Sequence, residues 1–262
     1  MELSKIISYS VKYPFRNIAK LPIMFVLFLL IVIIPIGKLL DNNYLVMIGV
    51  VAFFIFILIV PGYMLGMVRN GSIESSLFPS LSLGNRIYDS IRVLALRIVY
   101  MLVPTVIFFI SISTLGSSAG DLLFDFKIPN FLATLGLMLL VIVITYLIFE
   151  FLLFFAKARL AYLNSLPEAL KVHKGIIDIK NIGIVNIVKW LVVMAILVIA
   201  VSAISSTVMA IPYVGFIIYF AVIIPILESI GNYSLGMLYS NIVDTPNDLD
   251  KFERDIELLK YK

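Results

Sequence analysis

Six apolar stretches determine what this chain can fold into. They cover residues 21–37, 44–68, 98–115, 131–156, 190–211 and 213–236 of the 262-residue sequence. A helix crosses the hydrocarbon core of a bilayer with roughly 17 to 25 mostly apolar residues, so each stretch is long enough to span it. The sequence predicts an all-α integral membrane protein whose polytopic domain, residues 1–243, contains six transmembrane helices.

The last stretch is too long for one straight span. Its apolar character continues as far as Val243. Proline and polar side chains free backbone groups inside a helix. We therefore expect a bend or a break at Pro225 or within residues 228–233.

Composition excludes a soluble protein. Hydrophobic residues make up 62% of the sequence and charged residues 14%, which leaves too little polar surface to keep a folded domain in water. The net charge of +4 does not indicate nucleic acid, because the basic residues flank the apolar stretches, where orientation and lipid head groups account for them. The partner that the sequence predicts is the lipid bilayer.

The basic residues favour alternate gaps between the apolar stretches. Of the 20 Lys and Arg residues, only Lys38 and Lys127 lie in the other gaps. Basic residues in short loops resist translocation, so the loops that carry them stay inside the cell. We therefore expect a multi-pass protein of the cell membrane with both termini in the cytoplasm.

Three of the cytoplasmic segments combine charges with apolar residues at helical spacing. Residues 1–17 have the pattern of an amphipathic helix in the head-group layer. Ser165 and Glu168 have capping-box spacing, which predicts a helix running towards Gly175. Residues 244–262 predict an amphipathic tail helix. Because its charge is nearly balanced, docking on this chain or on a protein partner is favoured over lipid anchoring, with a solvated helix as the alternative.

The helix pairs also suggest an internal repeat. A unit of interfacial segment, outward span and return span begins near Ser4, Ser82 and Ser165. Residues 63–67 resemble residues 233–237 at the inner ends of the second and sixth spans. Three repeated helix-pair units would explain this match, but chance similarity between apolar helices is the favoured explanation.

Three charged residues lie inside the apolar stretches or at their edges, where each costs roughly 2.5 to 3.5 kcal/mol. They are Arg97, Glu150 and Glu228, and Asn232 lies one helical turn after Glu228. In one interpretation Arg97 neutralises a glutamate and fixes helix packing. In the other, the four residues form a polar site in a cavity open to the cytoplasm, and one glutamate is free to take a proton or bind a cation.

Signatures of enzymes and metal sites are missing from the sequence. It contains no cysteine, its one histidine is His173, and no glycine-rich phosphate loop ends in Lys-Ser or Lys-Thr. We therefore expect no catalytic residues, no metal and no cofactor. An intramembrane enzyme with Glu150 and Glu228 as paired carboxylates is the minor alternative.

A series of short motifs runs in order along most of the chain. They are Tyr13-Pro14-Phe15, Gly62-Tyr63, Arg69-Asn70, Pro79, Asp89, Tyr100, Pro104, Ser165-Leu166, Ala169-Leu170 and Ile211-Pro212-Tyr213-Val214-Gly215. Together these motifs resemble an uncharacterised family of archaeal multi-pass membrane proteins, domain of unknown function 4013. The chain departs from the family within residues 78–85, where an acidic stretch ending in tryptophan is usual. The resemblance implies a multi-pass membrane protein without an established activity.

Two classes of function fit these observations. A membrane-embedded transport or lipid-handling protein predicts that Arg97, Glu150 and Glu228 face one cavity with room for a ligand. A non-catalytic scaffold or accessory subunit predicts a tightly packed interior and exposed faces on the tail helix and on residues 77–92. The first class is favoured, with an unidentified small-molecule substrate.

Overall fold

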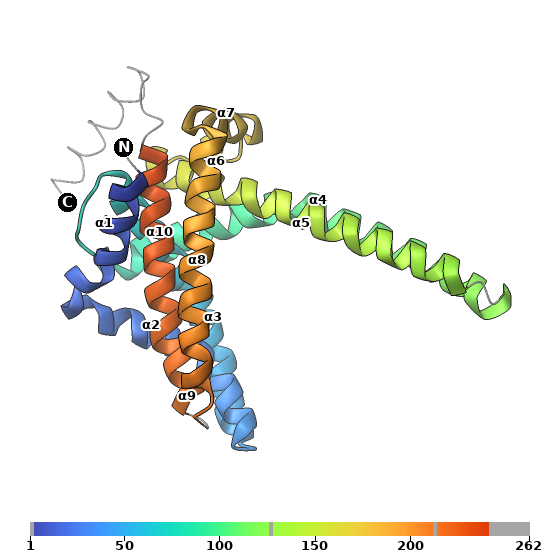
Figure 1. Ribbon diagram of the computed structural model, residues 1–262. Helices are drawn as coiled ribbons and strands as arrows, with labels where there is room; N and C mark the ends of the chain where they lie inside the picture. Colours follow the sequence, from blue (N-terminus) through green and yellow to red (C-terminus); the bar gives the residue numbers. More distant parts are fainter. Residues whose placement is uncertain (1–2, 126–127, 212–213, 241–262) are drawn as a thin grey trace.

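The computed structural model describes residues 3–125, 128–211 and 214–240, and about 90% of the structure is helical (Figure 1). A 3-10 turn, Ile18–Lys20, precedes α2, and a π-helical turn, Tyr219–Ile223, joins α9 to α10. These elements confirm the predicted all-α fold class. The α-helices are α1 Leu3–Arg16, α2 Leu21–Leu39, α3 Asn43–Ser72, α4 Leu83–Asp125, α5 Ile128–Leu163, α6 Leu166–Ala169, α7 Val172–Ile182, α8 Ile184–Met209, α9 Val214–Ile218 and α10 Ile224–Ser240.

Within the part of the chain that the structure describes, six helical segments are long and apolar enough to cross a membrane, as predicted. They are Ile18–Leu39, Asn43–Ser72, Leu83–Thr114, Leu135–Leu163, Ile184–Met209 and Val214–Ser240. The protein is therefore a multi-pass membrane protein. The tail helix predicted for residues 244–262 lies outside the described residues.

The helices extend beyond the apolar stretches that predict them. α4 begins at Leu83 and not near residue 98, and α5 continues past residue 156 to Leu163. No proline interrupts residues 83–97 or 157–163, and several charged side chains there have partners inside the protein. Charged residues that we expected in the segments between the spans therefore lie on α4 and α5.

The last membrane segment is irregular where the sequence predicts a bend. Pro225 is the second residue of α10 and directly follows the π-helical turn. Because proline has no backbone N–H, it cannot donate the hydrogen bond of a regular helix at this point. The π-helical turn accommodates that loss, and the segment continues to Ser240.

α3 lies at the centre of a bundle and contacts α2, α4, α5 and α10 (Figure 1). α1, α6 and α7 lie at one end of this bundle, which we call the charged end because the ion pairs of Asp89, Glu168 and Asp178 are found there. The helices predicted as return spans, α3, α5 and α10, contact one another in all three combinations. These contacts do not distinguish a repeat of three helix-pair units from the favoured explanation, chance similarity between apolar helices.

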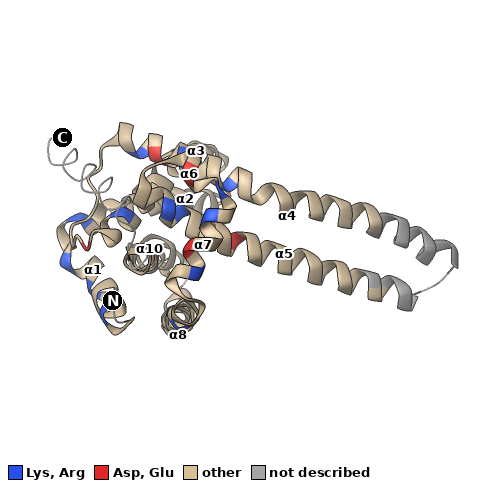
Figure 2. Cartoon of the chain, turned by 90° about the horizontal axis from the view of Figure 1, so that it is seen from above, with Lys and Arg blue, Asp and Glu red and all other residues tan. Residues whose placement is uncertain are grey.

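α4 and α5 form a long hairpin that projects to one side of the bundle (Figures 1 and 2). Residues 98–114 and 135–149 of this hairpin contain no Lys, Arg, Asp or Glu. Large apolar side chains are exposed along both helices, on surfaces of the kind that lipid covers. In Figure 1 the hairpin runs across the direction of α3, α8 and α10, and its base adjoins the bundle.

The apolar face of α1 is covered by protein. Ile6 and Tyr13 are buried against α10, and the Tyr13 ring stacks on the Tyr233 ring with their centroids 4.0 Å apart. The Tyr13 hydroxyl donates a hydrogen bond of 3.0 Å to the Leu77 carbonyl oxygen. Burial raises the pKa of Tyr13, so the hydroxyl stays a neutral donor. The face that we expected to lie in the head-group layer thus docks a helix onto the bundle.

The predicted helix after Ser165 is interrupted. Ser165 precedes α6, but its side chain makes no capping hydrogen bond, and α6 ends at Ala169. Arg159 Nε donates to the Glu168 carbonyl oxygen at 3.1 Å. In a continuous helix that oxygen would accept from the backbone N–H of Val172. The helix therefore stops and resumes as α7.

Glu168 gives the charged end a pH-dependent contribution to stability. The Lys171 ammonium donates to its carboxylate at 2.6 Å, with Arg159 close by, and this holds the pKa of Glu168 below its usual range. A carboxyl whose pKa is lowered by folding stabilises the fold above its unfolded pKa, which is about 4.3. That contribution is lost as the pH falls through the lower, folded-state pKa.

We therefore expect the difference in unfolding midpoint between the wild type and Glu168→Gln to be constant from pH 8 to about pH 5 and to shrink below it. Thermal unfolding of the detergent-solubilised protein at several pH values measures it. The exposed ion pair of Glu74 with Lys5, removed by Glu74→Gln, provides the matched control. A difference that grows on acidification would contradict this assignment.

Two glycines allow α3 and α10 to cross closely. A β-carbon at Gly236 would overlap the Val68 carbonyl oxygen, and one at Gly71 would overlap the Tyr233 carbonyl oxygen. Small residues permit such backbone contact where lipid provides no hydrophobic drive for association. Gly236 therefore lies at a contact of backbone against backbone, whereas Gly66 faces the Arg86 side chain and Pro79.

We expect Gly236→Ala to destabilise the protein by about 1–3 kcal/mol, because the added methyl group must push the two backbones apart. Gly136→Ala is the control, since a β-carbon there meets open space on α5. Thermal unfolding of both variants measures the difference. Equal unfolding midpoints for the two variants would show that the crossing is not tightly packed.

Candidate functional site

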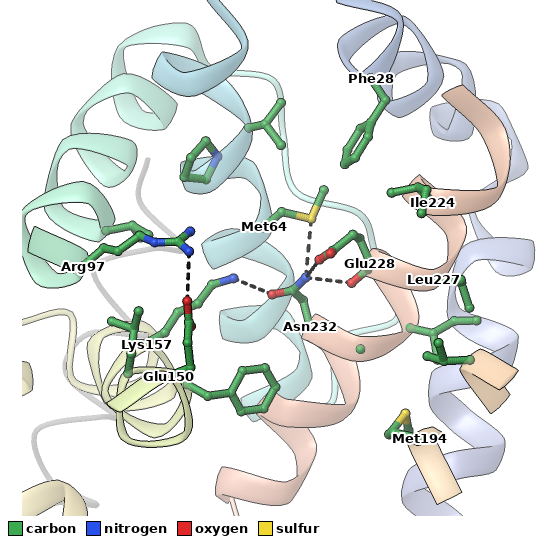
Figure 3. A pocket seen from close by; sticks show the side chains of 18 of the residues that line it. Phe28, Met64, Arg97, Glu150, Lys157, Met194, Ile224, Leu227, Glu228 and Asn232 are labelled. Carbon is green, nitrogen blue, oxygen red and sulfur yellow. Dashed lines mark hydrogen bonds and ion pairs between the residues drawn. The ribbon is translucent and has the colours of Figure 1, made fainter. Parts of the chain in front are cut away.

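One cavity of about 680 Å³ is lined by all six candidate membrane helices (Figure 3). Arg97 of α4, Glu150 of α5, and Glu228 and Asn232 of α10 all line it, so the structure brings the four residues of the predicted site together. A concave, mostly apolar space with a few convergent polar groups is the usual form of a ligand site.

The first polar element of the cavity is the ion pair between Arg97 and Glu150. The Arg97 Nη2 donates to Glu150 Oε1 at 2.9 Å, and the Tyr146 hydroxyl donates to the same oxygen at 2.9 Å. The Arg97 side chain is 58% exposed, so the pair leaves much of the guanidinium open to another group. Arg97 and Glu150 lie at depths in the membrane that allow them to meet, and the structure contains this ion pair.

The second polar element connects Lys157 to Glu228 through Asn232 (Figure 3). Lys157 Nζ donates to Asn232 Oδ1 at 2.6 Å, and Asn232 Nδ2 donates to Glu228 Oε2 at 2.9 Å. The Asn232 amide also contacts the Met64 sulfur at 3.6 Å. These contacts join α5, α10 and α3 across the cavity wall.

Lys157 also lines the cavity, although it is not one of the four residues of the predicted site. It directly follows the apolar stretch 131–156, where a basic residue is the usual end of a membrane span. Two helical turns separate it from Glu150, which puts both on one face of α5, and this spacing is the signal that could have identified it. With Lys157 the cavity lining has two positive and two negative side chains, so the expected excess of negative charge is not found there.

The remaining walls of the cavity are apolar. Phe28, Phe56 and Phe154 contribute rings, and Met194 and Trp190 line the side formed by α8. The Trp190 indole N–H is buried and has no acceptor among the described residues. A second hollow of about 500 Å³ lies between α4 and α5 with apolar walls, and Arg97 lines both spaces.

The family model for a protein of unknown function, DUF4013, matches residues 45–211, which is more than half of the chain. The chain belongs to the DUF4013 family. No curated protein and no solved structure matches it. The DUF4013 region contributes Arg97, Glu150, Lys157 and Trp190 to the cavity, whereas the part of α10 that carries Glu228 and Asn232 lies beyond it.

Proposed function

We propose that this DUF4013 protein is a membrane-embedded lipid-handling or transport protein that binds an amphipathic lipid in the central cavity. The observation that carries the proposal is the combination, in one space, of long apolar walls with two groups of charged side chains. Apolar walls suit acyl chains, and the partly exposed Arg97 suits an anionic part of the head group. No catalytic step is assigned to the site.

The alternative function, a scaffold or accessory subunit, is less well supported. It predicts a tightly packed interior, whereas the six helices leave a cavity of about 680 Å³ between them. It also predicts an exposed face on residues 77–92, and such a face is present, because Leu77, Leu81, Leu83, Tyr88 and Ile91 are exposed. The cavity alone therefore weighs against a scaffold. The predicted tail helix, the other docking element, lies outside the described residues.

Trp190 provides a direct test of lipid binding, because it is the only tryptophan of the chain and it lines the cavity while being 3% exposed. The full-length protein is placed in nanodiscs of phosphatidylcholine with a rising fraction of brominated phosphatidylcholine, which quenches tryptophan on contact. We expect quenching of Trp190 to rise in proportion to the brominated fraction, since a single bound lipid is brominated with that probability, whereas contact with many bulk lipids would give a steeper rise that levels off early.

Filling the cavity should abolish this quenching. Gly231 lines the cavity, and a β-carbon there meets open space, so Gly231→Leu occupies the cavity without a clash at its first atom. Gly136→Leu is the matched control, because Gly136 also faces open space but does not line the cavity. We expect the first variant to lose quenching severalfold and the second to behave as the wild type. Unchanged quenching in Gly231→Leu would refute lipid binding in the cavity.

We also propose that the charged end faces the cytoplasm in the cell membrane, which would open the polar site to that side. Support comes from the distribution of the basic residues. The chain has no native cysteine, so single cysteines can be labelled selectively. In intact cells, a membrane-impermeant maleimide should label Asp41→Cys and leave Lys171→Cys unlabelled until the membrane is permeabilised. The reverse pattern would overturn this orientation.

A further inference from the structure

A second group of charged side chains lies at the charged end, outside the residues that line the cavity. Arg69 of α3 and Arg86 and Arg92 of α4 surround the Asp89 carboxylate at 3.4, 3.7 and 3.4 Å. The side chains of Arg86, Asp89 and Arg92 are less than one tenth exposed, and Arg69 is about one fifth exposed. We call these four residues the arginine cluster.

The arginine cluster has more positive charge than its protein partners neutralise. Three guanidinium groups share one carboxylate, which leaves a formal charge of +2. The neighbouring group at the same end is balanced, because Arg159 and Lys171 face Glu168 and Asp178. The other partners of the three arginines are uncharged. Arg92 lies over the Tyr88 ring at 5.3 Å, and the remaining partners are the carbonyl oxygens of Gly62, Ser80, Ala161 and Asn164 and the Asn164 side chain.

Helix ends account for only part of the excess. The carbonyls of Ala161 and Asn164 belong to the C-terminal end of α5, and Arg69 lies in the last turn of α3. Each helix C-terminus carries roughly half a negative charge, so two of them leave about one positive charge without a partner. In addition, the Tyr63 hydroxyl, near Arg86, is buried without an acceptor among the described residues. The arginine cluster thus has more hydrogen-bond donors than acceptors and more positive than negative charge.

The exposed edge of the cluster has a defined place for one more acceptor. Asn164 Oδ1 accepts from Arg69 Nη2 at 3.2 Å and from Arg92 Nη1 at 2.7 Å. Asn164 is exposed and follows the end of α5 with a φ of 51°. A neutral amide oxygen therefore lies between two guanidinium groups at a point that solvent reaches.

We propose that the arginine cluster binds a phosphate group at the position of Asn164 Oδ1, supplied by a lipid head group or by a soluble phosphate compound. The planar guanidinium presents two parallel N–H groups that match phosphate oxygens, and such charge-assisted bonds are stronger than those to a neutral amide. Bound phosphate replaces the Asn164 side chain between Arg69 and Arg92 and neutralises the excess charge. This site uses other residues than the cavity and does not depend on lipid binding there.

The test uses the full-length protein in a maltoside detergent, which contains no phosphate. Thermal unfolding is followed with inorganic phosphate against chloride at equal ionic strength, and with short-chain phosphatidic acid against diacylglycerol of the same chains. We expect at least one phosphate-bearing probe to raise the unfolding midpoint more than its control. Stabilisation by phosphatidic acid alone identifies a lipid head group, and stabilisation by both identifies a general phosphate site.

Asn164→Asp is the decisive variant, because it puts a permanent carboxylate where the phosphate oxygen is proposed to bind. We expect it to unfold at a higher temperature than the wild type without any ligand and to bind the probe about tenfold more weakly. Arg69→Gln should weaken binding by a similar factor, whereas Lys171→Gln, in the balanced group, should leave binding unchanged. Equal binding by the wild type and Asn164→Asp, or no stabilisation beyond the controls, would overturn the proposal.

Discussion

Asp89→Asn is expected to lower the free energy of unfolding by about 3–5 kcal/mol, because it removes the one carboxylate that three arginines share. The substitution preserves the size of the side chain, so the loss measures charge and not packing. Arg86 and Arg92 are buried and cannot turn towards water to compensate. Unfolding of the solubilised protein with a denaturing detergent, followed by circular dichroism, gives the free-energy difference.

Glu74→Gln is the control for this measurement. Glu74 also pairs with a basic residue, Lys5, at 3.5 Å, but both side chains are more than 40% exposed. Exposed ion pairs contribute about 0–1 kcal/mol to stability. We therefore expect Asp89→Asn to lower the free energy of unfolding several times more than Glu74→Gln does. If phosphate binds the arginine cluster as proposed, it should also restore part of the stability that Asp89→Asn loses. Similar losses for the two variants would mean that the buried cluster is well hydrated.

The transmembrane helices were predictable because the bilayer imposes a length on each of them. Arg97 and Glu150 were predictable as a pair for a related reason, since a charge inside lipid needs a partner at the same depth. The ends of the helices could not be predicted from the sequence. Residues 83–97 are too charged to be counted as a membrane segment, yet they extend α4 because their charges are paired across helices.

The arginine cluster and the role of Lys157 could not be derived from sequence order. Asp89 is 20 residues from Arg69, and Lys157 is 75 residues from Asn232, so each contact depends on how the helices cross. The α3–α4 crossing includes a close backbone contact at Gly62, where a β-carbon would overlap the Arg86 carbonyl oxygen, and an apolar helix has no distinctive pattern that marks such a glycine. The direction of the α4–α5 hairpin could not be predicted either, because an exposed apolar face has the same residue pattern whichever way its helix points.

Lys157→Met is expected to destabilise the protein by about 2.5–3.5 kcal/mol, the cost of an intramembrane charge whose partner has been removed. Methionine keeps the length of the side chain and loses the ammonium group. Asn232 Oδ1 then has no donor from α5, and the negative charge of Glu228 is no longer offset. Denaturing-detergent titration measures the loss for the single variant.

The double variant Lys157→Met/Glu228→Gln separates charge compensation from a structural role of Lys157 alone. If Asn232 transmits the interaction between the two charges, removing both should recover about 1–3 kcal/mol relative to the sum of the single changes. Arg97→Met/Glu228→Gln is the matched comparison, because Arg97 pairs with Glu150 and should couple less strongly to Glu228. Additive losses in both cycles would show that neither Lys157 nor Arg97 is energetically coupled to Glu228, which would contradict charge compensation through Asn232.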